Sequence, residues 1–152
     1  MNIEELYQEL ILDHSKRPRN FGPLPEATVT VKGDNPACGD EVELAVKLTP
    51  EAVEALKFTG HGCAICMASA SLMTIKVKGK SRAVATEMAE AFRHMLVTPE
   101  ETPVPESFGD LEVFRAVRRF PQRVKCATLA WRALEQALSA APTAPVSTEE
   151  AD

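Results

Sequence analysis

Four cysteines are the side chains of this sequence best suited to chemistry. Cys38 lies in the segment 35–40, where proline and glycine favour a tight, exposed turn between two expected strands. Cys63 follows the glycine-rich segment 60–62 at the start of an expected helix, where unpaired N–H groups and the helix dipole favour a thiolate. Cys126 is expected in the first turn of the last helix. Three separate elements therefore offer sulfur.

Asp40, two residues after Cys38, can add an oxygen to these three thiols. Three sulfurs and one oxygen or nitrogen complete a closed tetrahedral zinc site. The spacing is not that of a compact zinc ribbon, in which cysteines come in two close pairs. From the residues alone, the alternative is a set of buried cysteines that behave as small hydrophobic residues. The glycine, proline and charged residues beside Cys38 and Cys63 argue against that alternative.

Cys63 and Cys66 also form a Cys-x-x-Cys pair at a helix start, an arrangement typical of thioredoxin-type redox proteins. A thioredoxin-type fold alternates helices and strands, whereas this chain has its expected strands early and its helices late. Cys66 is therefore interpreted as a small residue packed beneath the site, with an auxiliary thiol as the alternative.

Hydrophobic periodicity predicts the elements that position these side chains. A helical face near the amino terminus ends before Pro18, because proline excludes its preceding residue from helical geometry. Alternating apolar residues predict strands at 27–32 and 42–48, and a third strand ends at the segment 60–62. Helices are predicted from Cys63, from a Ser81 cap to Leu96, over 111–117, and over 124–138.

The expected fold class is therefore α+β: a small antiparallel three-stranded sheet covered by helices. Residues 1–139 are predicted to form a single domain, and the tail 140–152 is expected to be disordered.

The composition narrows the function. A net charge of −5 and a pI near 5.3 argue against nucleic acid as a partner, because such binding neutralises phosphates. No apolar run reaches the length of a membrane span, and the acidic residues of the segment 1–11 do not fit a signal peptide. Cysteines without an export signal are expected to stay reduced, which favours a cytoplasmic location.

Three motifs together resemble the signatures of the IscU/NifU-type iron–sulfur cluster assembly proteins. They are Asn35-Pro36-Ala37-Cys38-Gly39-Asp40, Gly60-His61-Gly62-Cys63 and Arg123-Val124-Lys125-Cys126-Ala127-Thr128-Leu129-Ala130-Trp131. The resemblance extends from the amino-terminal helix to Leu138, and it implies the IscU/NifU amino-terminal (SufE/NifU-like) fold. The scaffold branch of this family carries a histidine directly before the last cysteine, where this chain has Lys125. This departure and the extra segment between Cys63 and Cys126 resemble the SufU branch.

In the SufU branch the matching aspartate and three cysteines hold zinc. The resemblance therefore implies four metal ligands, which are Cys38, Asp40, Cys63 and Cys126. It also implies a SufS-type cysteine desulfurase that passes persulfide sulfur to Cys38, and downstream cluster scaffold or acceptor proteins. In that case the chain acts as a zinc-dependent sulfurtransferase partner of the desulfurase.

The residues around these four are open to two interpretations each. Arg123 and Lys125 either support a thiolate at Cys126 and an acidic partner surface, or they are solvated charges. His61 is either a supporting donor or spare ligand, or an incidental loop residue. Cys66 departs from the family, which usually has a different small residue there.

Three hypotheses about function remain after the sequence. The first is the zinc-binding sulfur acceptor. The second is a scaffold that assembles a transient iron–sulfur cluster on Cys38, Cys63 and Cys126, and Lys125 in place of histidine favours the first over it. The third, more remote, is a thiol–disulfide oxidoreductase that uses Cys63 and Cys66, in which Cys38 and Cys126 would be dispensable.

Overall fold

The computed structural model describes residues 3–99, 102–139 and 146–147. In chain order the elements are α1 (Ile3–Lys16), β1 (Val29–Asn35), β2 (Asp40–Leu48), β3 (Val53–His61), α2 (Ala64–Val77), α3 (Arg82–Met95), the 3₁₀ helix η1 (Glu106–Arg119), α4 (Pro121–Leu138) and β4 (Val146–Ser147). After α1 come three consecutive strands, and the other helices follow them, as the sequence predicts for an α+β fold.

The sheet is built on two antiparallel pairs, β1 with β2 and β2 with β3. Buried residues alternate with partly or fully exposed ones along most of β1 and β2, because one face of the sheet packs on the helices. The predicted three-stranded antiparallel sheet is confirmed, and the two-residue strand β4 adds a parallel pairing on the outer edge of β1. The rest of the tail for which disorder is predicted lies outside the described residues.

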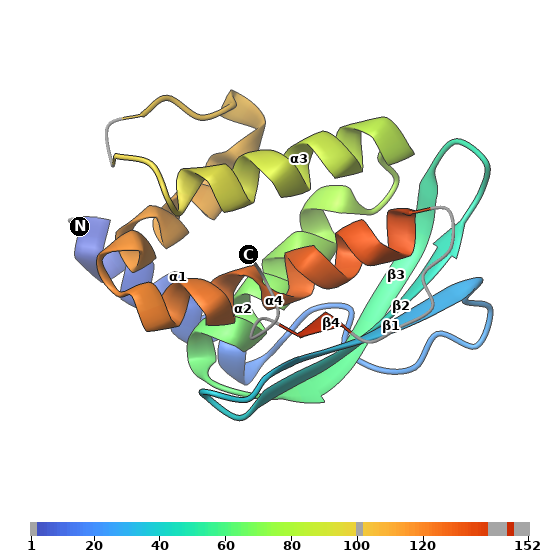
Figure 1. Cartoon of the computed structure of the whole chain (residues 1–152), viewed down its shortest axis with the longest axis horizontal. Coiled ribbons are helices and arrows are strands. Elements are labelled where there is room, and N and C mark those ends of the chain that lie inside the picture. Colours follow the sequence, from blue (N-terminus) through green and yellow to red (C-terminus); the bar gives the residue numbers. More distant parts are fainter. Residues whose placement is uncertain (1–2, 100–101, 140–145, 148–152) are drawn as a thin grey trace.

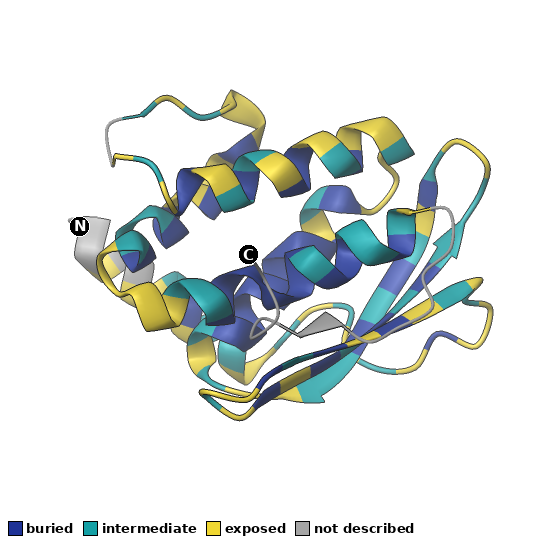
Figure 2. Cartoon of the chain, in the orientation of Figure 1, coloured by how far each residue is buried: buried dark blue, intermediate teal, exposed yellow. Residues whose placement is uncertain are grey.

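The helices form a layer on one face of the sheet, as Figure 1 shows. Helix α4 contacts β1 and β2 on one side and α2 and α3 on others, so it is central to the core. Its Trp131 is fully buried and stacks on Phe92 of α3, with ring centroids 4.6 Å apart. Figure 2 shows that the buried residues gather where these helices and the sheet meet.

Local signals in the sequence set the helix starts. Cys63 is the N-cap of α2, and the Ser81 hydroxyl caps α3 by accepting a hydrogen bond from the Val84 N–H at 3.0 Å, as predicted. Helix α4 begins at Pro121, whose missing N–H costs nothing at a first helical position. This start lies three residues before the predicted one.

The segment before α4 differs from the short helix predicted at 111–117. It is a 3₁₀ helix from Glu106 to Arg119, interrupted where Gly109 adopts a φ of 47°. No helix among the described residues has the length and apolar composition needed to cross a bilayer.

Candidate metal centre

The hairpin between β1 and β2 carries the first two predicted site residues. Asn35 and Asp40 face each other as the last pair of the ladder, so residues 36–39 form a tight turn. The Cys38 N–H donates to the Asn35 carbonyl at 3.2 Å, and Gly39 has a φ of 70°, in the left-handed region that favours glycine. The turn leaves Cys38 half-buried, whereas Asp40 is buried.

The end of β3 brings Cys63 against the same hairpin. The Cys63 N–H donates a 2.8 Å hydrogen bond to Asp40 Oδ1. Glycine is required at position 62, since a Cβ there would lie 2.5 Å from Asp40 Oδ1. The Asp40 carboxylate therefore fills the space that a side chain at Gly62 would need.

Helix α4 supplies the third sulfur from a position different from the one predicted. Because α4 begins at Pro121, Cys126 is its sixth residue and does not lie in the first turn. It is fully buried, and its Sγ lies 3.8 Å from the Gln122 carbonyl oxygen one turn earlier. The expectation that Cys126 lies in the first turn of the last helix is therefore wrong.

The structure brings three of the four predicted ligands into one cluster. Single ligand atoms of Cys38, Asp40 and Cys126 all lie within 4.8 Å of one another. Cys63 adjoins this group, since its thiol hydrogen-bonds with that of Cys126 and its N–H with Asp40. Zinc bonds of about 2.0 to 2.3 Å place tetrahedral ligand atoms roughly 3.3 to 3.8 Å apart. A small contraction of the Cys38, Asp40 and Cys126 donors therefore fits zinc, with Cys63 beside them.

Asn35 is a residue of the centre to which the sequence assigned no role. It is fully buried, and its side-chain nitrogen donates to Asp40 Oδ2 at 3.1 Å and lies 3.4 Å from Cys126 Sγ. One amide thus joins a β2 carboxylate to an α4 sulfur. The only signal for it in the sequence is its place in the motif that contains Cys38.

The hydrogen bond between the thiols of Cys63 and Cys126 shifts their two pKa values in opposite directions. The hydrogen bond from Cys126 lowers the pKa of Cys63 to about 6, and the Cys66 and Ile65 N–H groups at the start of α2 add to the effect. The same hydrogen bond, together with burial, raises the pKa of Cys126. Without metal, Cys63 is therefore the thiolate and Cys126 is the thiol.

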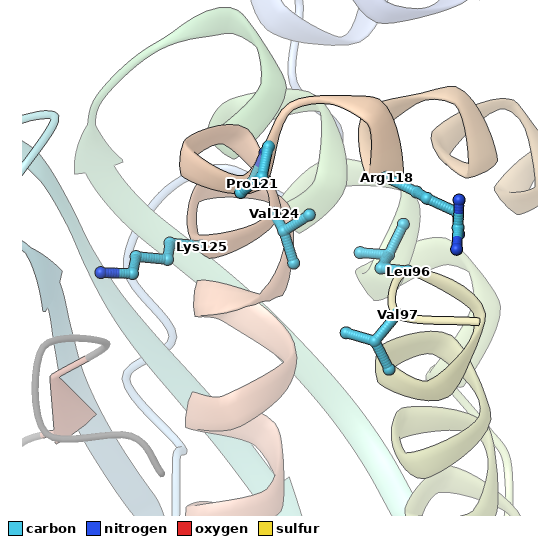
Figure 3. Close-up of a pocket in the computed structure, with 6 residues that line it drawn as sticks. All are labelled: Leu96, Val97, Arg118, Pro121, Val124 and Lys125. Carbon is cyan, nitrogen blue, oxygen red and sulfur yellow. The ribbon is translucent and has the colours of Figure 1, made fainter. Parts of the chain in front are cut away.

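Arg123 lies beside these sulfurs. The Cys63 thiolate and a hydrogen bond with Cys126 raise the pKa of this guanidinium. Its side chain is exposed on the first turn of α4, so it adds a positive charge next to the centre. Lys125 is half-buried directly before Cys126 and lines a groove next to the centre (Figure 3).

Cys66 and His61 do not belong to the ligand cluster among the described residues. Cys66 is fully buried in the hydrophobic core, and burial is the main cause that raises the pKa of its thiol. Its N–H points to Cys63 Sγ at 3.5 Å. His61 is exposed and lies 2.7 Å from a carboxylate oxygen of Glu41.

Comparison with known proteins identifies relatives of this fold and centre. The family model described as the NifU-like N terminal domain matches residues 6–127. A protein of Bacillus subtilis (strain 168) named zinc-dependent sulfurtransferase SufU is 44% identical over 138 residues, which is 91% of this chain and 92% of the relative. A protein of Streptococcus pyogenes serotype M1 named iron–sulfur cluster assembly scaffold protein IscU is 40% identical, covering 97% of this chain and 92% of the relative.

Solved structures show the same fold. One, from the thermophile Fervidobacterium islandicum AW-1 and described as an iron–sulfur cluster assembly scaffold protein for the SUF system, superposes with a TM-score of 0.81. It is 35% identical and covers 90% of this chain and 98% of its own. The amino-terminal part of a NifU-like protein from Brucella abortus superposes with a TM-score of 0.77 at 26% identity, covering 88% of this chain and 92% of its own. The chain therefore belongs to the NifU-like N-terminal domain family.

Proposed function

We propose that this protein is a zinc-binding sulfur acceptor of SufU type in iron–sulfur cluster assembly. It receives persulfide sulfur from a SufS-type cysteine desulfurase and passes it on to downstream scaffold or acceptor proteins in the cytoplasm. The observation that carries the proposal is the convergence of the Cys38, Asp40 and Cys126 ligand atoms within 4.8 Å, with Cys63 hydrogen-bonded to the last two. The zinc-dependent sulfurtransferase named among the relatives supports it.

The proposed zinc ligands are Cys38, Asp40, Cys63 and Cys126. When bound, zinc holds thiolates deprotonated and screened at neutral pH. The protein positions two of these ligands by hydrogen bonds: Asn35 holds Asp40 and Cys126, and the Cys63 N–H holds the other oxygen of Asp40. The carboxylate keeps lone pairs free for a metal, because each oxygen has two.

Cys38 is the proposed sulfur acceptor, because it lies half-buried in the hairpin turn, whereas Cys126 is fully buried and the half-buried Cys63 is fixed as the N-cap of α2. In the transfer step the Cys38 thiolate attacks the terminal sulfur of the donor's cysteine persulfide. The donor S–S bond breaks, its electron pair leaves on the donor cysteine as a thiolate, and Cys38 becomes the persulfide. Arg123 places positive charge beside the sulfurs that carry negative charge through this step, and Lys125, directly before Cys126, is the second proposed supporting residue.

The alternative is a scaffold that holds a transient iron–sulfur cluster on Cys38, Cys63 and Cys126, since thiolates bind both zinc and such clusters. Relatives named as IscU scaffolds at 40% and 34% identity favour it. Lys125 in place of histidine favours the sulfur acceptor. The Cys63–Cys66 redox function ranks last, because burial raises the pKa of Cys66, and this thiol must become a thiolate to close the disulfide.

The deciding experiment is metal and labile-sulfide analysis of anaerobically purified protein, followed by incubation with a SufS-type desulfurase and cysteine. Trypsin separates the thiols, because cleavage after lysine and arginine puts Cys38 on peptide 33–47, Cys63 and Cys66 on 58–76, and Cys126 on 126–132. Stoichiometric zinc without sulfide, and added sulfur on peptide 33–47 that is absent in Cys38→Ser, support the proposal.

Two results would contradict it. Iron with stoichiometric sulfide would make the protein a scaffold. Sulfur on peptide 58–76 or 126–132 of the parent protein would exclude Cys38 as the acceptor, as would Cys38→Ser that accepts sulfur at the parent rate. Cys66→Ser is the matched control, since it removes a thiol from the same neighbourhood outside the proposed ligand set.

A further inference from the structure

A groove with an apolar floor lies between the end of α3 and the start of α4. It has a volume of about 420 Å³, and its lining residues are Leu96, Val97, Arg118, Pro121, Val124 and Lys125. We refer to it as the α3–α4 groove. In Figure 3, Val124 lies across from Leu96 and Val97, Arg118 lies beyond those two, and Lys125 extends from the other side of Val124.

Large hydrophobic side chains are exposed to solvent in and beside the groove, whereas most such side chains of this protein are buried. Val97 is 68% exposed and Phe120, next to the lining residue Pro121, is 58% exposed. These are the two most exposed large hydrophobic side chains in the described part of the chain. Apolar surface gathered in one place and rimmed by polar groups is a mark of an interaction site.

The charge on the groove is opposite to that of the whole protein. Both charged lining residues, Arg118 and Lys125, are basic, whereas the chain has a net charge of −5. The Arg118 Nε–H donates to the Thr98 carbonyl at the end of α3, which holds the guanidinium at the rim. A fitting partner segment therefore combines an apolar side chain with carboxylates on both sides of it.

The α3–α4 groove and the candidate metal centre share the first two turns of α4. Val124 and Lys125 line the groove, while Cys126 follows directly and belongs to the centre. A partner seated in the groove is thereby placed within one helical turn of Cys126. A sulfur donor must bring its own cysteine to the candidate metal centre. It is therefore the kind of partner that we expect to bind next to this centre.

We propose that the α3–α4 groove docks the sulfur donor protein, taking up an apolar side chain of the donor while flanking carboxylates pair with Arg118 and Lys125. The proposal rests on the proposed function. It adds a docking contact that brings the donor to the centre. The residues of this contact are different from the residues that react with sulfur. Docking strength should therefore be separable from the capacity of the thiols to accept sulfur.

The test measures the dissociation constant of zinc-loaded protein for a SufS-type cysteine desulfurase by calorimetry. Val97→Asp and Arg118→Glu each place negative charge in the groove. Their matched controls are Val84→Asp, at an exposed valine in the first turn of α3, and Lys80→Glu, just before that helix. These controls lie about 20 Å from the groove, given the 1.5 Å rise per residue of α3.

We expect each groove variant to weaken binding at least about tenfold, as a charge placed at an interface centre commonly does, while the controls stay within about twofold. Rising salt should weaken binding of the parent, and more steeply than binding of Arg118→Glu, because an ion pair has been removed. Zinc content and the final yield of persulfide at saturating desulfurase should equal those of the parent.

The outcomes distinguish the two proposals. If the parent neither binds the desulfurase nor accepts its sulfur, the proposed function fails. If the parent does both and Val97→Asp and Arg118→Glu bind like their controls, the function stands and the groove inference is overturned. Self-association of the parent that Val97→Asp abolishes, with desulfurase binding intact, would assign the groove to a second copy of this chain.

Discussion

The side-chain nitrogen of Asn35 lies 3.4 Å from Cys126 Sγ and 3.1 Å from Asp40 Oδ2. These three residues come from the end of β1, the start of β2 and the interior of α4. A single buried amide thus fixes the sheet edge of the candidate centre relative to the helix that covers it. The arrangement makes Asn35 a positioning residue for two proposed ligands.

Asn35→Ala should weaken zinc binding by about 10- to 100-fold, the usual effect of removing a hydrogen-bond partner of a metal ligand. Competition with a chromophoric chelator measures the affinity. Asn20→Ala is the matched control, because Asn20 also donates a side-chain hydrogen bond, to Thr74 Oγ1 at 2.9 Å, outside the metal centre. Equal zinc affinity in Asn35→Ala and the parent would remove this role from Asn35.

Gly62→Ala should also impair metal binding, through a steric effect. The new Cβ would lie 2.5 Å from Asp40 Oδ1, so the carboxylate must move away from the Cys63 N–H and from the sulfurs. We expect at least about a tenfold loss of zinc affinity, again by chelator competition. Gly22→Ala is the control, since Gly22 has a φ of 138° but open space around its Cβ position. Gly22→Ala should lower the free energy of unfolding but leave zinc affinity unchanged. Lost zinc affinity in Gly22→Ala with unchanged affinity in Gly62→Ala would refute the steric argument.

His14 should make folding stability depend on pH. Burial is the main cause that lowers its pKa from 6.5; Arg19 lowers it further, whereas Asp13 and Asp110 raise it. Since the unfolded chain binds the proton more readily, the contribution of His14 is fully present above pH 6.5. It is lost as pH falls below 6.5 towards the folded-state pKa.

Urea unfolding at pH 7.5 and 5.5 tests this prediction. One proton gives a slope of at most about 1.4 kcal/mol per pH unit. His14→Gln keeps a hydrogen-bonding side chain near Ser71 Oγ, which lies 2.7 Å from Nδ1, but it does not titrate. The variant should lose less stability than the parent between these two pH values. An identical loss in both proteins would show that other groups cause the pH dependence.

Cys66→Ala should leave zinc binding and sulfur acceptance intact. Cys66 is fully buried in the core beneath Cys63, and it contributes to the centre through its backbone N–H, which alanine retains. Replacing a small buried thiol by alanine should cost about 1 kcal/mol of unfolding free energy. Zinc analysis and the peptide assay for added sulfur measure the outcome. Loss of sulfur acceptance in zinc-loaded Cys66→Ala would revive a function for the Cys63–Cys66 pair.

Much of the secondary structure follows from local patterns in the sequence. Alternating apolar residues identified all three antiparallel strands, and Ser81 marked the start of α3, because these signals act between near neighbours in the chain. The sequence also identified the residue types of the centre, since thiols beside glycine and proline are unusual in a core. Their order and spacing were enough to indicate the family.

Tertiary structure decided how these residues meet. Cys126 is buried in the second turn of α4, because Pro121 starts that helix earlier than its apolar periodicity indicates. Asn35 acquires its role only when α4 packs across the hairpin and brings Cys126 to it across 91 positions of sequence. The α3–α4 groove likewise exists only where the ends of two helices lie side by side. Local sequence patterns do not encode contacts between distant elements. They also do not encode the burial that shifts the pKa of a thiol, so both features are visible only in the folded chain.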